Sequence, residues 1–99
     1  MLFHIVSKTV WQAALVAGLY QPASLKTEGF IHLSTASQVP GVIARYYRNV
    51  PDLLLLHIEA QRLKAPLKYE VATGGESFPH LYGPLNLDAV VKTESVDPK

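Results

Sequence analysis

The chain has 99 residues, of which 48% are hydrophobic and 17% charged. This composition is typical of a globular protein and excludes a disordered one. A chain of this length buries enough surface for one modest core, so we expect a single domain over residues 1–99. The formal net charge is +1 and no run of basic residues occurs, which disfavours a nucleic-acid polymer as partner.

Cysteine and long apolar segments are both absent from the sequence. Without cysteine, the chain has no disulfide, no cysteine-ligated zinc and no thiol catalysis. The stretch MLFHIVSKTV lacks a signal-peptide pattern, and no segment approaches the roughly 18 apolar residues of a membrane span. We therefore expect a cytoplasmic protein without membrane association.

The first predicted elements are a strand and a helix. Residues 2–6 are an apolar run typical of a strand, and Ser7 follows as the N-cap of a helix. Trp11 and Ala14 recur at helical spacing, and Gly18 stands where a helix commonly ends.

A predicted loop, a short strand and a second helix come next. Residues 20–29 have the composition of turns and irregular backbone, and residues 30–33 resume a strand pattern. Thr35 and Gln38 have the spacing of a capping box, which predicts a helix that extends to about Arg48.

The second half of the chain reads as strands alone. Residues 53–59 contain four consecutive leucines and are predicted to form the central strand, buried on both faces. Further extended segments are expected at 67–71, 78–85 and 87–96, and the prolines at 79 and 84 favour an edge or a turn for the second of them. Five or six short strands with two main helices predict the α+β class.

All four histidines lie in these predicted strands or just after one. Because alternate side chains of a strand share a face, Phe30, His32 and Ser34 are expected on one face of their strand, and His80 and Tyr82 are expected to share a face of theirs. A strand histidine is often only a half-buried structural residue, and this interpretation applies best to His57, with Glu59 as its surface companion. It is an alternative for His4, too.

His32 stands beside Ser34 and Thr35 at a strand-to-helix junction. A helix N-terminus offers free N–H groups and a partial positive charge, so this junction is a candidate anion site, although Ser34 and Thr35 have plain capping as an alternative role. His80, between Pro79 and Tyr82, is the second candidate. An imidazole suits proton transfer because its pKa lies close to neutral pH.

Other sites have weaker signals in the sequence. The histidines lie more than twenty residues apart, so no metal site is expected unless the fold assembles one. Neither a nucleophile elbow nor a glycine-rich phosphate loop occurs. The candidate carboxylates, which the sequence does not pair with any histidine, are Glu28, Glu59, Glu70 and Glu76.

Three segments, LFHIV, GFIHLST and FPHLYGPLNLDAVV, resemble a bacterial family of unknown function, the domain-of-unknown-function family numbered nine-fifty-two. The resemblance covers nearly the whole chain. That family resembles, more distantly, the ADP-ribosyltransferase superfamily, which includes poly(ADP-ribose) polymerases and NAD-using RNA 2′-phosphotransferases. The resemblance implies a compact α+β fold of two small, mostly antiparallel sheets, with NAD in a cleft between them.

The resemblance also implies roles for particular residues. LFHIV is similar to a Leu-Tyr-His-Gly-Thr type motif whose histidine bonds a ribose hydroxyl of NAD, and His4 would take that role. Ile5 and Val6 depart from that motif, and no late catalytic glutamate can be assigned beyond the candidates Glu70 and Glu76. The three arginines, at positions 45, 48 and 62, lie outside the recognisable motifs.

The prediction for function is a protein that binds NAD, ADP-ribose or a related nucleotide, as a transferase of the ADP-ribosyl or phosphoryl type. His32 and His80 are the expected catalytic residues, and the expected ligand-binding residues are His4, Ser34, Thr35 and Tyr82. Two alternatives stay open: a non-catalytic binding module that retains the fold, and an NAD-independent hydrolase or transferase of a small phosphorylated substrate. No heptad pattern specifies an oligomeric state.

Overall fold

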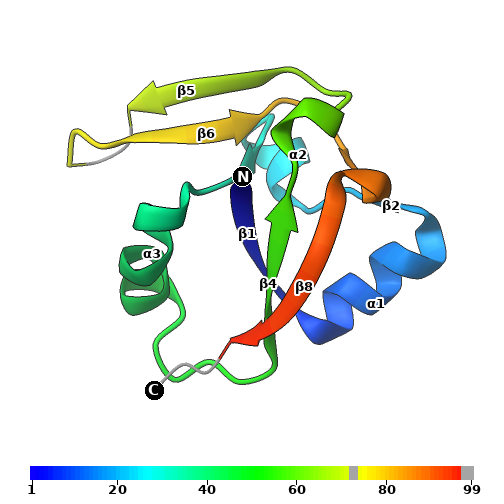
Figure 1. Ribbon diagram of the computed structural model, residues 1–99, viewed down its shortest axis with the longest axis horizontal. Helices are drawn as coiled ribbons and strands as arrows, with labels where there is room; N and C mark the ends of the chain where they lie inside the picture. Colours follow the sequence, from blue (N-terminus) through cyan, green and yellow to red (C-terminus); the bar gives the residue numbers. More distant parts are fainter. Residues whose placement is uncertain (72–73, 97–99) are drawn as a thin grey trace.

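The computed structural model describes residues 1–71 and 74–96, which form an α+β fold with three small antiparallel sheets (Figure 1). The first sheet has the order β1 (Leu2–Ser7), β4 (Leu53–Ile58), β8 (Val90–Val96). The second pairs β2 (Leu19–Tyr20) with β7 (Leu85–Asn86), and the third has the order β3 (Ile31–His32), β6 (Ser77–Leu81), β5 (Leu67–Val71). The helices are α1 (Lys8–Ala17), α2 (Ser24–Thr27) and α3 (Val39–Tyr46), with 3₁₀ turns at Ala36–Gln38, Ala60–Arg62 and Leu87–Ala89.

The α+β class is confirmed, but three sheets replace the two that were expected. The additional sheet is the two-residue pair of β2 and β7, which is too short to be recognised from alternation. The segment 20–29, predicted to be irregular, contains Tyr20 of β2 and the single turn of α2. None of the helices in the described part of the chain is long and apolar enough to cross a bilayer.

Strand β4 is the central strand of the first sheet, as its leucine run predicted. It pairs antiparallel with β1 on one side and with β8 on the other. Leu56 and Ile58 have no exposed surface, and Leu53 is buried too, whereas Leu54 and Leu55 are half-buried. The apolar run of β4 therefore contributes several side chains to the hydrophobic core.

Helix α1 begins and ends where the sequence places its caps. The hydroxyl of Ser7 accepts a hydrogen bond from the N–H of Val10 at 3.2 Å, and Gly18 ends the helix at φ +80°, a conformation that glycine adopts at little cost. Trp11 and Ala14 are its buried residues, and they pack in the core with Tyr20. The sequence prediction for this helix is confirmed.

Replacing the cap Ser7 with alanine is expected to lower the free energy of unfolding by about 1 kcal/mol, because the N–H of Val10 loses its acceptor. Urea denaturation followed by circular dichroism measures the loss. Thr9→Ala, at an exposed position of the same first turn, is the control and should change stability by less than half as much. Equal effects of the two changes would show that the cap contributes nothing.

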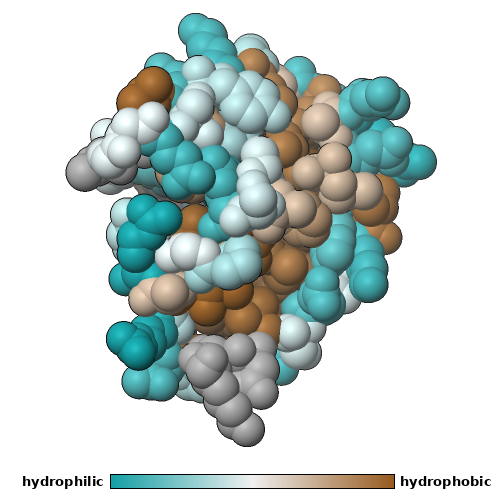
Figure 2. All heavy atoms as spheres, turned by 60° about the vertical axis from the view of Figure 1, so that its left-hand side comes forward, coloured by the Kyte–Doolittle hydropathy of each residue, from teal (hydrophilic) through white to brown (hydrophobic). Residues whose placement is uncertain are grey.

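The second predicted helix starts more tightly and ends earlier than expected. Thr35 and Gln38 form the capping box, but it opens a 3₁₀ turn, and α3 then runs only to Tyr46. None of the residues of α3 is buried, and Tyr46 is 69% exposed. In Figure 2, which brings the α3 side of the molecule forward, hydrophobic residues remain visible at the surface of this side. Helix α3 therefore covers its side of the first sheet only partly.

The prediction that Pro79 favours an edge strand or a turn is wrong, because β6 is the middle strand of the third sheet. The carbonyl of Pro79 accepts a hydrogen bond from the N–H of Leu33 at 3.0 Å, but proline has no N–H to return a second bond. Strand β3 ends at His32, so the missing donor falls just beyond it. A proline is tolerated here because one neighbouring strand is only two residues long.

Candidate functional site

One face of the third sheet gathers aromatic, basic and acidic side chains. Because side chains alternate between the two faces of a sheet, Ile31, Leu33 and Leu81 point to the core, where each has at most 1% exposed surface. The opposite face, here called the histidine face, consists of Phe30, His32, Lys68, Glu70, Phe78, His80 and Tyr82. The β5–β6 hairpin that carries most of these residues crosses one end of the first sheet (Figure 1).

His32 and His80 are directly opposite each other in the antiparallel pair of β3 and β6. Residues in such a position share a face and lie close together, and the two ring centroids are 5.3 Å apart. Phe30 stacks on the His80 ring with a centroid distance of 4.0 Å. His80 is consequently 93% buried despite its place on the outer face, whereas the side chain of His32 is 56% exposed.

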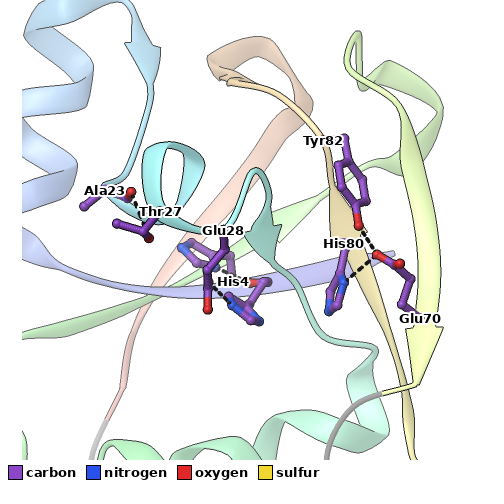
Figure 3. A network of polar contacts seen from close by, with 8 residues as sticks. His4, Ala23, Thr27, Glu28, Glu70, His80 and Tyr82 are labelled. Atoms are coloured by element: carbon purple, nitrogen blue, oxygen red, sulfur yellow. Dashed lines mark hydrogen bonds and ion pairs between the residues drawn. The ribbon is translucent and has the colours of Figure 1, made fainter.

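Glu70 links His80 to Tyr82. The Nδ1–H of His80 donates to Oε1 of Glu70 at 3.0 Å, and the hydroxyl of Tyr82 donates to the same oxygen (Figure 3). These two hydrogen bonds, the one from Tyr82 first, lower the pKa of Glu70, and the bond to Glu70 raises the pKa of Tyr82. Because Glu70 engages the Nδ1 of His80, Nε2 is the ring nitrogen that remains for a hydrogen bond to a ligand.

Glu28 has the same relation to His32. The Nε2–H of His32 donates to Oε2 of Glu28 at 2.6 Å, which leaves Nδ1 as its second nitrogen. Gly29 has φ +87°, a left-handed conformation that turns the chain sharply between α2 and β3. This turn brings the carboxylate of Glu28 within hydrogen-bond distance of the His32 ring. Two imidazoles, each held by its own carboxylate, therefore face one another.

His4 lies beside this pair but is fully engaged by the protein. Its Nδ1–H donates to the carbonyl oxygen of His32 at 2.7 Å, and its Nε2 accepts from the hydroxyl of Tyr20 at 2.9 Å. Burial lowers the pKa of His4 to about 4 and raises the pKa of Tyr20 to about 12. His4 is therefore neutral at pH 7, and a ribose hydroxyl would have to displace Tyr20 to reach its Nε2.

Ser34 and Thr35 have structural contacts at the junction. Ser34 is 92% buried, and its backbone exchanges two hydrogen bonds of 2.8 Å with Phe3. The N–H of Thr35 donates to the carboxamide of Gln38 at 3.0 Å, so this backbone donor already has an acceptor. The capping alternative is thus supported for Thr35, whereas the contacts of Ser34 form a β-bridge to Phe3.

The prediction that Glu59 accompanies His57 is wrong. His57 pairs instead with Glu94 of β8 at 2.5 Å, while Glu59 pairs with Arg62 at 3.0 Å. Glu59 lies one residue beyond β4, where the chain turns into the 3₁₀ turn that carries Arg62, so it does not follow the alternation of the strand. His57 lies in the first sheet and does not belong to the histidine face.

Two of the three arginines are held in ion pairs, and Lys68 belongs to the histidine face. Arg45 pairs with Glu76 and Arg62 with Glu59, whereas Lys68 places its Nζ 5.2 Å from the ring centroid of Tyr82. Within residues 1–71 and 74–96, no group of three or more potential ligands is arranged to hold a metal ion.

A separate open hollow of about 240 Å³ lies between α1 and β2, and no predicted site residue lines it. Tyr20, the partner of His4, contributes to its wall.

The structure thus brings together four of the predicted residues, His4, His32, His80 and Tyr82. Sequence reasoning missed Tyr20 and could not choose Glu28 and Glu70 among the carboxylates. Glu70 follows Lys68 by two residues and shares its face of β5, but only the pairing of β5 with β6 aligns that face with His80. Glu28 had no signal, since it precedes the strand and depends on the turn at Gly29.

Comparisons with known proteins agree with this architecture. The crystal structure of protein CC0527 from Caulobacter crescentus is similar, with 37% sequence identity and a TM-score of 0.89 over 97% of this chain and 85% of that one. The solution NMR structure of CC0527 is similar as well, with 37% identity and a TM-score of 0.84 over 97% and 84% of the two chains. No curated protein matches the sequence. Residues 5–93 match the family described as "Protein of unknown function (DUF952)", and the chain belongs to that family.

Proposed function

We propose that the histidine face binds the ribosyl part of a nucleotide such as ADP-ribose or NAD, and that His32 and His80 exchange protons with the bound ligand. The observation that carries the proposal is the facing pair of imidazoles, 5.3 Å apart, each with a carboxylate partner. The resemblance to the ADP-ribosyltransferase superfamily supports the choice of ligand.

The proposed chemistry follows from the nitrogens that remain for a ligand. In the described part of the chain, every fully buried side-chain nitrogen or oxygen has a hydrogen-bond partner. His80 bonds Glu70 through Nδ1, and its Nε2 has no partner there, so Nε2 is not fully buried. The Nε2 of His80 is therefore reachable from solvent although most of the residue is covered. The side chain of His32 is 56% exposed, and its Nδ1 is not the nitrogen that bonds Glu28. One such nitrogen can accept a proton from a hydroxyl, and the other can donate one to a leaving oxygen when its ring is in the protonated, imidazolium form.

The surrounding residues fit a ribose better than a pyrophosphate. The rings of Phe30 and Tyr82 lie beside the imidazoles, and the centroids of these two aromatic rings are 5.3 Å apart. A planar group of the ligand can pack against them. Lys68 is a cation in contact with this face, whereas Arg45 and Arg62 are held in ion pairs with Glu76 and Glu59. We assign the ligand's hydroxyl groups to the two histidines and a single phosphate to Lys68.

A non-catalytic binding module is the second candidate, and one observation favours it. Both nitrogens of His4 are satisfied within the protein, so the histidine that the superfamily uses for ribose has a structural role in this chain. A module of this kind would bind a nucleotide and leave it unchanged. An NAD-independent hydrolase of small phosphorylated substrates would instead turn over generic phosphate esters.

Calorimetric titration of the full chain with ADP-ribose, NAD and a 2′-phosphorylated nucleotide tests the proposal. We expect saturable binding of at least one of them, weakened about 10- to 100-fold in Glu70→Gln, because the charge that orients His80 and Tyr82 is lost. Glu94→Gln is the matched control, since Glu94 also pairs with a histidine but lies in the first sheet. No binding to any probe, or equal losses in the two variants, would refute the proposal.

A further inference from the structure

We propose that His4 is a positioning residue for His32: it ties β3 to β1 through one side-chain hydrogen bond and thereby sets the His32 ring opposite His80. This inference deepens the proposed function, on which its relevance to ligand binding rests. The positional effect itself can be measured without any ligand.

The need for such a tie follows from the length of β3. This strand has two residues and pairs with β6 along one edge only. On its other side, the backbone contact with β1 begins at Ser34, which exchanges two hydrogen bonds with Phe3. The Nδ1–H of His4 reaches the carbonyl of His32 itself, at 2.7 Å, so a side chain supplies the bond that the backbone ladder does not.

The hydrogen bonds determine a single tautomer for His4. A carbonyl oxygen can only accept, so Nδ1 carries the proton and Nε2 is the acceptor for the hydroxyl of Tyr20. Tyr20 is 95% buried and packs against Trp11, with ring centroids 6.3 Å apart. The core therefore fixes the orientation of the His4 ring through Tyr20. The hydrogen bond from His4 in turn fixes the position of the His32 carbonyl.

The half-buried His4 has no ring nitrogen left for direct proton transfer. Both ring nitrogens have partners within the protein, and burial keeps the imidazole neutral by lowering its pKa to about 4. Its contribution to the histidine face is therefore geometric, through the position of His32.

NMR spectroscopy of the full, ligand-free chain tests the inference. The ring ¹⁵N spectrum should show the Nδ1–H tautomer for His4, and NOE cross-peaks should connect the ring protons of His32 and His80. His4→Leu, which removes the donor, should reduce these cross-peaks at least twofold. His4→Asn, which keeps an N–H near the position of Nδ1, should restore them. Tyr20→Phe retains the ring but releases Nε2, so it should weaken them as well and serves as the second variant if His4→Leu does not fold.

Val6→Ala is the matched control, because Val6 is a buried residue on the same face of β1 that makes no side-chain hydrogen bond. It should lower the melting temperature without changing the cross-peaks. The Nε2–H tautomer in the wild type, unchanged cross-peaks in folded His4→Leu or Tyr20→Phe, or an equal loss in Val6→Ala would each overturn the inference. Failure of ADP-ribose, NAD and the 2′-phosphorylated nucleotide to bind the wild type would refute the proposed function and leave the NMR result intact.

Discussion

Replacement of His32 by alanine is expected to weaken ADP-ribose binding at least about 100-fold, while the free energy of unfolding changes by no more than about 1 kcal/mol. The side chain of His32 is 56% exposed, and its pair with Glu28 is a surface contact, so little stability is lost with it. The loss of binding is large because the variant removes one of the two facing imidazoles. Calorimetry with ADP-ribose gives the affinity, and urea denaturation gives the stability.

His57→Ala is the control for this prediction. His57 also pairs with a carboxylate, that of Glu94 at 2.5 Å, but it lies in β4, away from the histidine face. We expect His57→Ala to bind ADP-ribose like the wild type and to be less stable than His32→Ala, because its side chain is only 17% exposed. Unimpaired binding by folded His32→Ala would remove the central residue of the proposed site.

The second large effect is a loss of folding stability in mild acid. His4 has a pKa of about 4 in the folded chain and an ordinary value of 6.5 when unfolded. The unfolded chain therefore binds more protons between these two values, so stability is complete above pH 6.5 and falls as the pH decreases toward 4. The difference corresponds to up to about 3 kcal/mol.

Urea denaturation at pH 7, 6, 5 and 4 measures this loss, and His4→Asn should make the profile over this range nearly flat. The lowered pKa values of Glu70 and Asp88 act in a different window, since their stabilisation is present above their ordinary values of 4.5 and 3.8 and disappears at lower pH. Both carboxylates remain in His4→Asn, so a decline below pH 4.5 should persist. An unchanged slope between pH 6.5 and 5 in His4→Asn would show that another group causes the loss.

Local signals predicted those elements whose stability depends on neighbouring residues in the chain. The cap at Ser7, the stop at Gly18 and the leucine run of β4 each act over a few residues, and all three predictions are confirmed. The two-residue strand β2 escaped prediction, because it exists only through its pairing with β7, a partner distant in the chain. The position of Pro79 in a middle strand was mispredicted for the same reason, because a proline is tolerated there only where the neighbouring strand β3 ends.

For the candidate site, the sequence by itself determined which side chains share a face. Alternation has a period of two, so in a strand Phe30 shares a face with His32, Lys68 with Glu70, and His80 with Tyr82. Ser34, which was expected on the face of Phe30 and His32, is instead buried in a bridge to Phe3. Only the tertiary structure decided that these three pairs meet on one surface. The pairing of β3 with β6 joins residues 48 to 50 positions apart, and its register is set by burial of the opposite face, so no local pattern encodes it.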